Sequence, residues 1–187
     1  YEDAIRDYTE MIRLQPTCSS TYINRAFTNI RLQNFDDAIL DCTKAIKMGC
    51  QDQGAAYNNR AMAYNGKKQW SAAVQDATMS IALDKVDAAA WSHRSRAHFH
   101  LKKYDRAIQD ATTSIDLFSS PTALPLSFRN FQHIIPVYEQ AYRIRIESYL
   151  MIGEKDLADQ DETTLNGILA NGPTFLQTRE EEEPKVW

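Results

Sequence analysis

A repeat of about 34 residues limits what this chain can fold into. The segments YEDAIRDYTEMI, FDDAILDCTKAI, WSAAVQDATMSI and YDRAIQDATTSI align with one another; they begin at Tyr1, Phe35, Trp70 and Tyr104, at offsets of 34, 35 and 34 residues. A period of this length is typical of arrays in which one supersecondary unit stacks on the next and buries a continuous core. The sequence therefore predicts a repeat array.

Each copy contains the pattern of two helices. In the downstream segment, apolar residues recur with the spacing of one helix face, as in Phe35, Ala38, Cys42, Ala45 and Ile46; a strand would need strict alternation. The blocks YINRA, YNNRA and WSHRS lie upstream of the last three segments and supply the partner helix. Both helices of a copy carry alanines, such as Ala26 and Ala38, whose small side chains let the two helices approach closely. We therefore expect the two helices to pack as an antiparallel pair.

This pattern resembles the tetratricopeptide repeat, a helix-turn-helix family with the same period. The aromatic fourth position of that repeat is occupied by Tyr22, Tyr57 and Trp91, and its eighth-position alanine by Ala26 and Ala61. The resemblance implies an all-α solenoid of antiparallel helix pairs with a right-handed superhelical curve.

The copies also predict how the chain is divided. We expect the second helix of a truncated repeat at 1–17, repeats at 18–51, 52–85 and 86–117, an insertion at 118–134, a degenerate repeat at 135–170 and a polar tail at 171–187. The insertion carries Phe128 and Phe131, which either tuck against the last helix pair or project to bind a partner. Because the chain starts inside a helix, it reads as a piece of a longer protein, and we expect self-association or a partner chain to cover that end.

An aspartate and an arginine recur in the copies. The structural set is Asp7, Asp41, Asp76, Arg25, Arg60 and Arg94. An active site gathers unlike groups at one place, whereas these residues are copied along the array, so we interpret them as ion pairs that hold the repeats. We expect Asp7 to pair with Arg25, Asp41 with Arg60 and Asp76 with Arg94; pairing inside one repeat is the alternative.

The resemblance also indicates where a partner binds, because the first helix of each pair lines the concave side. The predicted peptide-binding groove consists of Asn24, Phe27, Asn59, Met62, His93, Arg96 and Phe99. The amides would bond the backbone of an extended peptide, and the apolar residues would receive its side chains. The alternative is that these are ordinary surface residues.

Asn24 and Asn59 match two asparagines with which co-chaperone-type repeats hold the C-terminal carboxylate of a heat-shock chaperone. The basic positions of that clamp are occupied here by Ser20, Ala89 and His93, so the full carboxylate clamp is absent. A chaperone tail is therefore the lesser interpretation. If a free carboxyl terminus does bind, we expect protonation of His93 to raise affinity as the pH falls from about 7.5 to 6.

Composition excludes other classes of function. The net charge of −4 provides no attraction for nucleic acid, and no apolar run is long enough to insert into a membrane. The spacing of Cys18, Cys42 and Cys50 fits neither disulfides nor a metal site, which indicates a reducing, cytoplasmic compartment. His93, His98 and His100 lack the spacing of metal ligands, and no catalytic motif occurs, so we expect no metal, no cofactor and no enzyme activity.

These observations predict a non-catalytic protein–protein interaction module, an adaptor or scaffold that binds an extended peptide or partner segment. The alternatives are a targeting module of a larger multidomain enzyme and a co-chaperone that binds chaperone C-terminal tails.

Overall fold

The computed structural model describes residues 1–49, 51–119 and 135–171, and this part of the chain consists of nine helices without a strand. The helices are α1 (Glu2–Leu14), α2 (Ser19–Arg31), α3 (Phe35–Lys47), α4 (Gln53–Gly66), α5 (Trp70–Leu83), α6 (Ala88–His100), α7 (Tyr104–Ser119), α8 (Ile135–Ile152) and α9 (Lys155–Asn171). Phe128, Phe131 and nearly all of the predicted insertion and tail lie outside the described residues.

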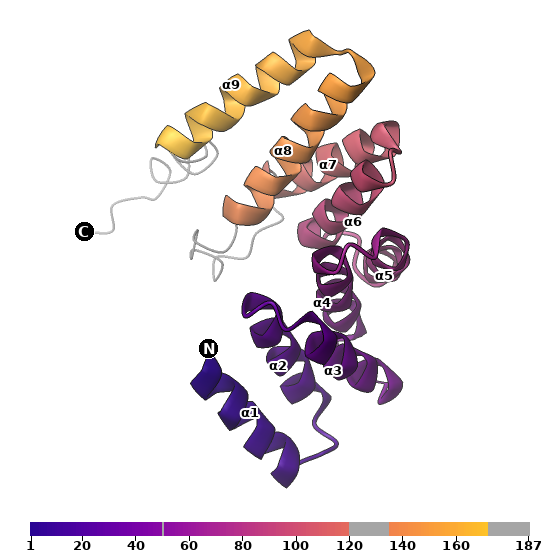
Figure 1. The fold of residues 1–187 in the computed structure, drawn as a ribbon, viewed down its shortest axis with the longest axis vertical. Coiled ribbons are helices and arrows are strands. Elements are labelled where there is room, and N and C mark those ends of the chain that lie inside the picture. The colour runs from indigo at the N-terminus through magenta and orange to yellow at the C-terminus, as the bar shows by residue number, and fades with distance from the viewer. Residues whose placement is uncertain (50, 120–134, 172–187) are drawn as a thin grey trace, which may run out of the picture.

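The helices stack into a curved array with α1 at one end and α9 at the other (Figure 1). Successive helices form the antiparallel pairs α2/α3, α4/α5, α6/α7 and α8/α9, and each pair packs on the next. The first helices also contact one another in the order α2, α4, α6, α8, which makes them a continuous row on the concave side of the curve. The predicted all-α solenoid is confirmed.

The core of this array consists of small side chains at the helix crossings. Ala26, Ala38, Ala61, Ala73 and Ala107, which recur in the sequence pattern, are all fully buried. Without a longer side chain between them, the helix backbones approach closely, and the larger aromatic and aliphatic residues fill the remaining space beside them.

One glycine is needed for this packing. A Cβ placed on Gly66, at the end of α4, would overlap the ring of Phe35 at the start of α3. Only a residue without a side chain lets these two helices meet here.

The turn between the two helices of a pair has the same conformation each time. Its central residue lies in the left-handed region, with φ of 62° at Gln33, 59° at Lys68, 60° at Lys102 and 88° at Gly153. The residue after it donates its N–H to the carbonyl five residues back, which satisfies one of the last carbonyls of the first helix. This common turn fixes how the two helices of each pair face each other.

Candidate functional site

Four arginines on the first helices each hold an aspartate on the second helix of the same pair through two hydrogen bonds. The bonds are Arg25 to Asp41 at 2.8 and 2.7 Å, Arg60 to Asp76 at 2.6 and 2.9 Å, Arg94 to Asp110 at 2.8 and 2.8 Å, and Arg145 to Asp161 at 2.6 and 2.6 Å. The expected pairing between repeats, Asp7 with Arg25, Asp41 with Arg60 and Asp76 with Arg94, is therefore wrong. Asp7 is exposed.

The turn explains this pairing. Arg60 and Asp76 lie eight residues before and eight residues after Lys68, the central turn residue, and the other three pairs are centred in the same way on their turn residues. Residues at equal distances from the turn of an antiparallel pair face each other. The sequence contained this signal, but it could be used only once the centre of the turn was known.

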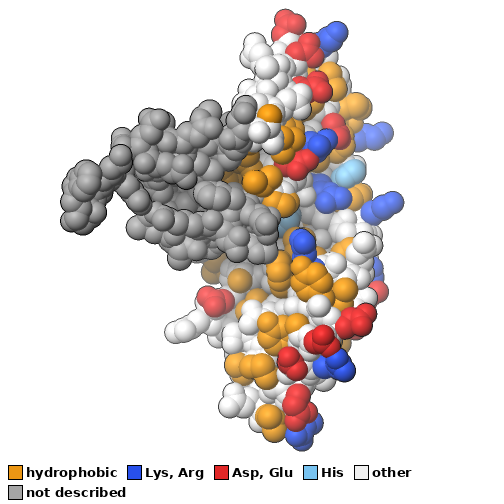
Figure 2. Space-filling view, turned by 90° about the vertical axis from the view of Figure 1, so that its left-hand side faces the viewer, with side chains coloured by type: hydrophobic (Ala, Val, Ile, Leu, Met, Phe, Trp, Pro, Cys, Tyr) orange, Lys and Arg blue, Asp and Glu red, His pale blue; other side chains and the backbone are white. Residues whose placement is uncertain are grey.

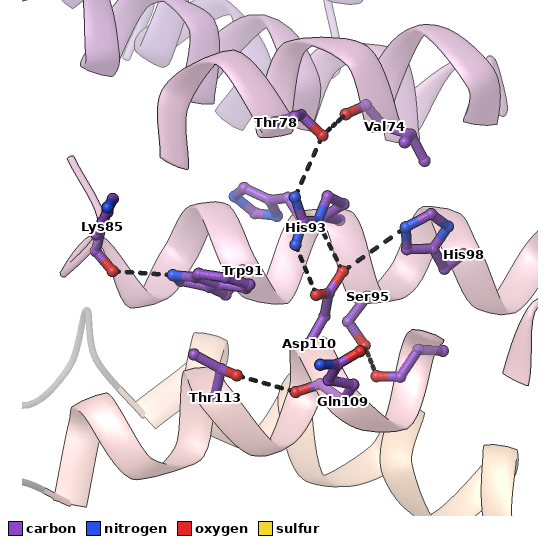
Figure 3. A network of polar contacts seen from close by, with 12 residues as sticks. Val74, Thr78, Lys85, Trp91, His93, Ser95, His98, Gln109, Asp110 and Thr113 are labelled. Atoms are coloured by element: carbon purple, nitrogen blue, oxygen red, sulfur yellow. Dashed lines mark hydrogen bonds and ion pairs between the residues drawn. The ribbon is translucent and has the colours of Figure 1, made fainter. Parts of the chain in front are cut away.

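Each arginine also contacts the helix that precedes its own pair. The guanidinium group of each arginine donates a further hydrogen bond to the hydroxyl oxygen of a threonine on that helix. These bonds are Arg25 to Thr9 at 3.0 Å, Arg60 to Thr43 at 2.9 Å, Arg94 to Thr78 at 3.3 Å and Arg145 to Thr112 at 3.0 Å. Each of these threonines follows two residues after a recurring aspartate, a motif that the sequence interpretation missed. Figure 3 shows the network around Asp110, in which Thr78 reaches the same cluster from the neighbouring helix.

Aromatic rings complete the surroundings of the four guanidinium groups. The guanidinium carbon of Arg25 lies 5.9 Å from the ring centroid of Tyr22, that of Arg60 5.4 Å from Tyr57, that of Arg94 4.7 Å from Trp91 and that of Arg145 5.2 Å from Tyr142. The hydrogen bond to Asp76 raises the pKa of Arg60 above its usual value. These four arginines join the repeats, and their donors are occupied by other groups of the scaffold.

The concave row presents two of the predicted groove residues openly on α2. Asn24 is exposed, and Phe27, about one turn further along, is 43% exposed. Both α2 positions are therefore accessible to a partner. Figure 2 shows the side that lies on the left in Figure 1, where hydrophobic side chains gather between charged ones.

The groove residues of α4 are partly used inside the protein. Asn59 is half-buried and donates from Nδ2 to the carbonyl of Ile23 at 3.4 Å, which ties α4 to α2. Met62 is half-buried and packs against the cluster that contains Ala26 and Cys42. Asn59 thus links α4 to α2, and Met62 packs in the core where α2, α3 and α4 meet.

His93 does not have the role that the sequence suggested. Its side chain is only 7% exposed, and burial, with a smaller effect of Arg96, lowers its pKa to about 4. Its carbonyl accepts a hydrogen bond from Nδ2 of Asn65 at 2.9 Å, which ties α4 to α6. The expectation that His93 becomes charged between about pH 7.5 and 6 and strengthens binding is therefore wrong, because the buried ring stays neutral in this range.

The remaining predicted residues lie on α6. Arg96 is half-buried and donates to Oε1 of Gln140 on α8 at 3.5 Å, and Gln140 in turn donates to Oγ of Ser92 at 3.0 Å. Phe99 is half-buried beside His100, with 5.3 Å between the ring centroids. Sequence reasoning missed Gln140, because only the arrangement of α6 and α8 reveals that it bridges the two helices.

In the ranges that the structure describes, no group of three or more His, Cys, Asp or Glu side chains is arranged to hold a metal ion. None of the described helices is long and apolar enough to span a bilayer.

Known proteins resemble the chain in part. No family model matches it. Over 80 residues it is 38% identical to human DnaJ homolog subfamily C member 7, a match that covers 41% of this chain and 16% of that relative. The fold aligns with residues 41 to the end of MamA from Desulfovibrio magneticus RS-1, with a TM-score of 0.68 at 12% identity, over 98% of this chain and 88% of that one.

A shorter alignment shows the fold of the repeat. The first TPR domain of human RPAP3 aligns with a TM-score of 0.52 at 22% identity, over 68% of this chain and 98% of that domain. The chain has the fold of a tetratricopeptide repeat solenoid. In this solenoid the four Arg–Asp pairs are structural, and the concave row of first helices, open at Asn24 and Phe27, is the candidate functional surface.

Proposed function

We propose that this solenoid is a non-catalytic protein–protein interaction module, an adaptor or scaffold that binds an extended segment of a partner protein along α2, α4 and α6. The observation that carries the proposal is the exposure of Asn24 and of Phe27 side by side on the concave row. An amide can both donate a hydrogen bond to a peptide backbone and accept one from it, and an exposed ring can pack against an apolar side chain of the peptide. An extended segment would thus be bound through its backbone by Asn24 and through one apolar side chain by Phe27.

The hydrogen bonds within the concave row support this proposal. Asn59 joins α4 to α2, Asn65 joins α4 to α6, and Gln140 joins α8 to α6. Helices that are already fixed relative to one another lose little conformational entropy when a ligand binds. The groove is therefore preorganised, and Asn59 contributes to binding chiefly by holding its shape.

Within this proposal an internal segment is a better ligand than a free carboxyl terminus. Ser20 and Ala89 supply no charge, and the lowered pKa of His93 keeps that imidazole neutral. A carboxylate that loses its water needs cationic partners, which these positions do not provide. A chaperone tail thus remains the lesser alternative, and a targeting module of a larger enzyme is compatible with the same groove. Among the described residues, Cys18 and Cys42 form no disulfide, which supports a reducing compartment such as the cytoplasm.

The test uses peptides selected on the intact chain from a random library. We expect Asn24→Ala combined with Phe27→Ala to weaken a selected peptide about tenfold or more, because a hydrogen bond of about 1 kcal/mol and an apolar contact are lost. Leu40→Ala is the matched control, since Leu40 is an exposed apolar residue on α3, a second helix. Affinity is measured by fluorescence anisotropy, with circular dichroism to check helix content.

Two results would contradict the proposal or refine it. Equal affinity of the double variant and the unchanged chain would place binding away from the α2 groove. Each peptide is also made with a free and with an amidated carboxyl terminus. We expect the two forms to bind equally, and a strong preference for the free form would restore the carboxylate-clamp alternative.

A further inference from the structure

The edge of the solenoid formed by the turns within the helix pairs carries a cationic patch beside an aromatic stack. Trp70, the first residue of α5, and His100, the last residue of α6, stack with their ring centroids 4.0 Å apart and their planes 17° from parallel. Lys68 lies in the turn before Trp70, and Lys102 and Lys103 lie in the turn after His100. We call these five residues the turn patch.

The lysines of the turn patch have no counter-ions among the described residues. Lys68, Lys102 and Lys103 are exposed and form no ion pair there, whereas Lys67, next to Lys68, pairs with Asp36. Burial is the main cause that lowers the pKa of His100, Arg96 and Lys68 lower it further, and Glu147 raises it.

The backbone of the turn does not require lysine at either of two of these positions. Lys68 and Lys102 occupy the left-handed turn position, with φ of 59° and 60°, which glycine adopts without strain and in fact occupies in the last pair as Gly153. A lysine at this position is more strained than glycine, although its charge next to the C-terminus of the first helix is favourable. Nor does the patch follow from composition, because the chain as a whole has a net charge of −4.

We propose that the turn patch binds an acidic segment of a partner protein, with its carboxylates between Lys68 and Lys102. The charge complementarity of three unpaired ammonium groups carries this choice of ligand. The net negative charge of the chain disfavours a long polyanion such as nucleic acid. The site lies at the ends of the first helices and does not depend on the proposed groove contacts of Asn24 and Phe27, so the two proposals can fail separately.

The experiment measures binding of a fluorescent, end-blocked peptide of alternating glutamate and serine to the full chain, with a glutamine-for-glutamate peptide alongside. We expect the double variant Lys68→Gly and Lys102→Gly to bind the acidic peptide about fivefold more weakly in about 0.05 M salt, because two exposed charge contacts are lost. The matched control, Lys44→Gln with Lys47→Gln, removes the same charge from exposed positions on α3 and should bind as the unchanged chain does. Carbodiimide cross-linking should couple the peptide to lysines of the patch.

Four results would overturn the proposal. Equal weakening by both double variants would show that only net charge matters, and equal binding of the glutamine peptide would show that carboxylates are not recognised. Displacement by single-stranded DNA at the same concentration would point to nucleic acid. Tighter binding after the glutamates at 180–183 are changed to glutamine would show that this chain's own acidic run, and not a partner's, occupies the patch. The variant Asn24→Ala should leave binding unchanged.

Discussion

At the scale of single residues, one buried imidazole makes the stability of the solenoid depend on pH. Burial lowers the pKa of His93 from 6.5 to about 4. Between these values the unfolded chain binds a proton that the folded chain excludes, so stability is lost as the pH falls from 6.5 towards 4, by about 3 kcal/mol at most. The pKa values of His98 and His100 are lowered too, with burial as the main cause, and act in the same direction. We expect the urea midpoint to fall over this range.

The variant His93→Gln isolates this effect. Glutamine does not titrate, and the hydrogen bond that Asn65 donates to the backbone carbonyl at 93 can persist. We therefore expect urea midpoints of the variant, measured from pH 7 to 4.5, to fall less steeply than those of the unchanged chain. Parallel curves for the two proteins would contradict the assignment of the pH dependence to this ring.

At the scale of the helix pair, the sequence was enough to predict the helices but not enough to predict all of the contacts between them. The recurrence of an aromatic residue and an alanine, as in Phe35 and Ala38, predicted the paired helices because few other folds repeat a close-packed contact at this period. The partner of Arg25 was ambiguous, since Asp7 and Asp41 lie at similar separations, and the turn centred on Gln33 decides between them. The burial of His93 depends on how α6 packs against its neighbours, which no local pattern encodes.

Replacing either of two glycines of α4 by alanine should change the stability of the helix pair, but in opposite directions. Alanine has a higher helix propensity than glycine by about 1 kcal/mol, so Gly54→Ala, whose Cβ would make only ordinary contact with Leu83, should raise the thermal midpoint. Gly66→Ala adds the same methyl group where the ring of Phe35 lies, and overpacking of this kind costs about 1–3 kcal/mol. We expect its thermal midpoint, measured by circular dichroism, to fall. A gain in stability from both changes would show that Phe35 moves aside freely.

At the scale of the whole molecule, the described helices form a line of pairs in which the main contacts join each pair to its neighbours along the array. The arginines connect this line in both directions, since Arg60 binds Asp76 within its own pair and Thr43 in the preceding pair. Stability in such an array is close to a sum of terms for single repeats and for the interfaces between neighbours. The position of a lost contact along the line should therefore decide how far its effect extends.

The variants Arg60→Ala and Arg145→Ala test this dependence on position. Each leaves a buried carboxylate without its cation, Asp76 in the first case and Asp161 in the second, at a cost of about 3–5 kcal/mol, and each breaks one bond to a neighbouring threonine. Arg60 lies in the middle of the array, so its loss should weaken amide protection in α2 to α5 and divide unfolding into two steps. Arg145 lies in the last pair, so its loss should expose α8 and α9 while α2 to α5 stay protected. Hydrogen exchange read by mass spectrometry distinguishes the two patterns. Uniform loss of protection across all helices in both variants would mean that the array opens as a single cooperative unit, because the interfaces would then be stronger than the repeats they join.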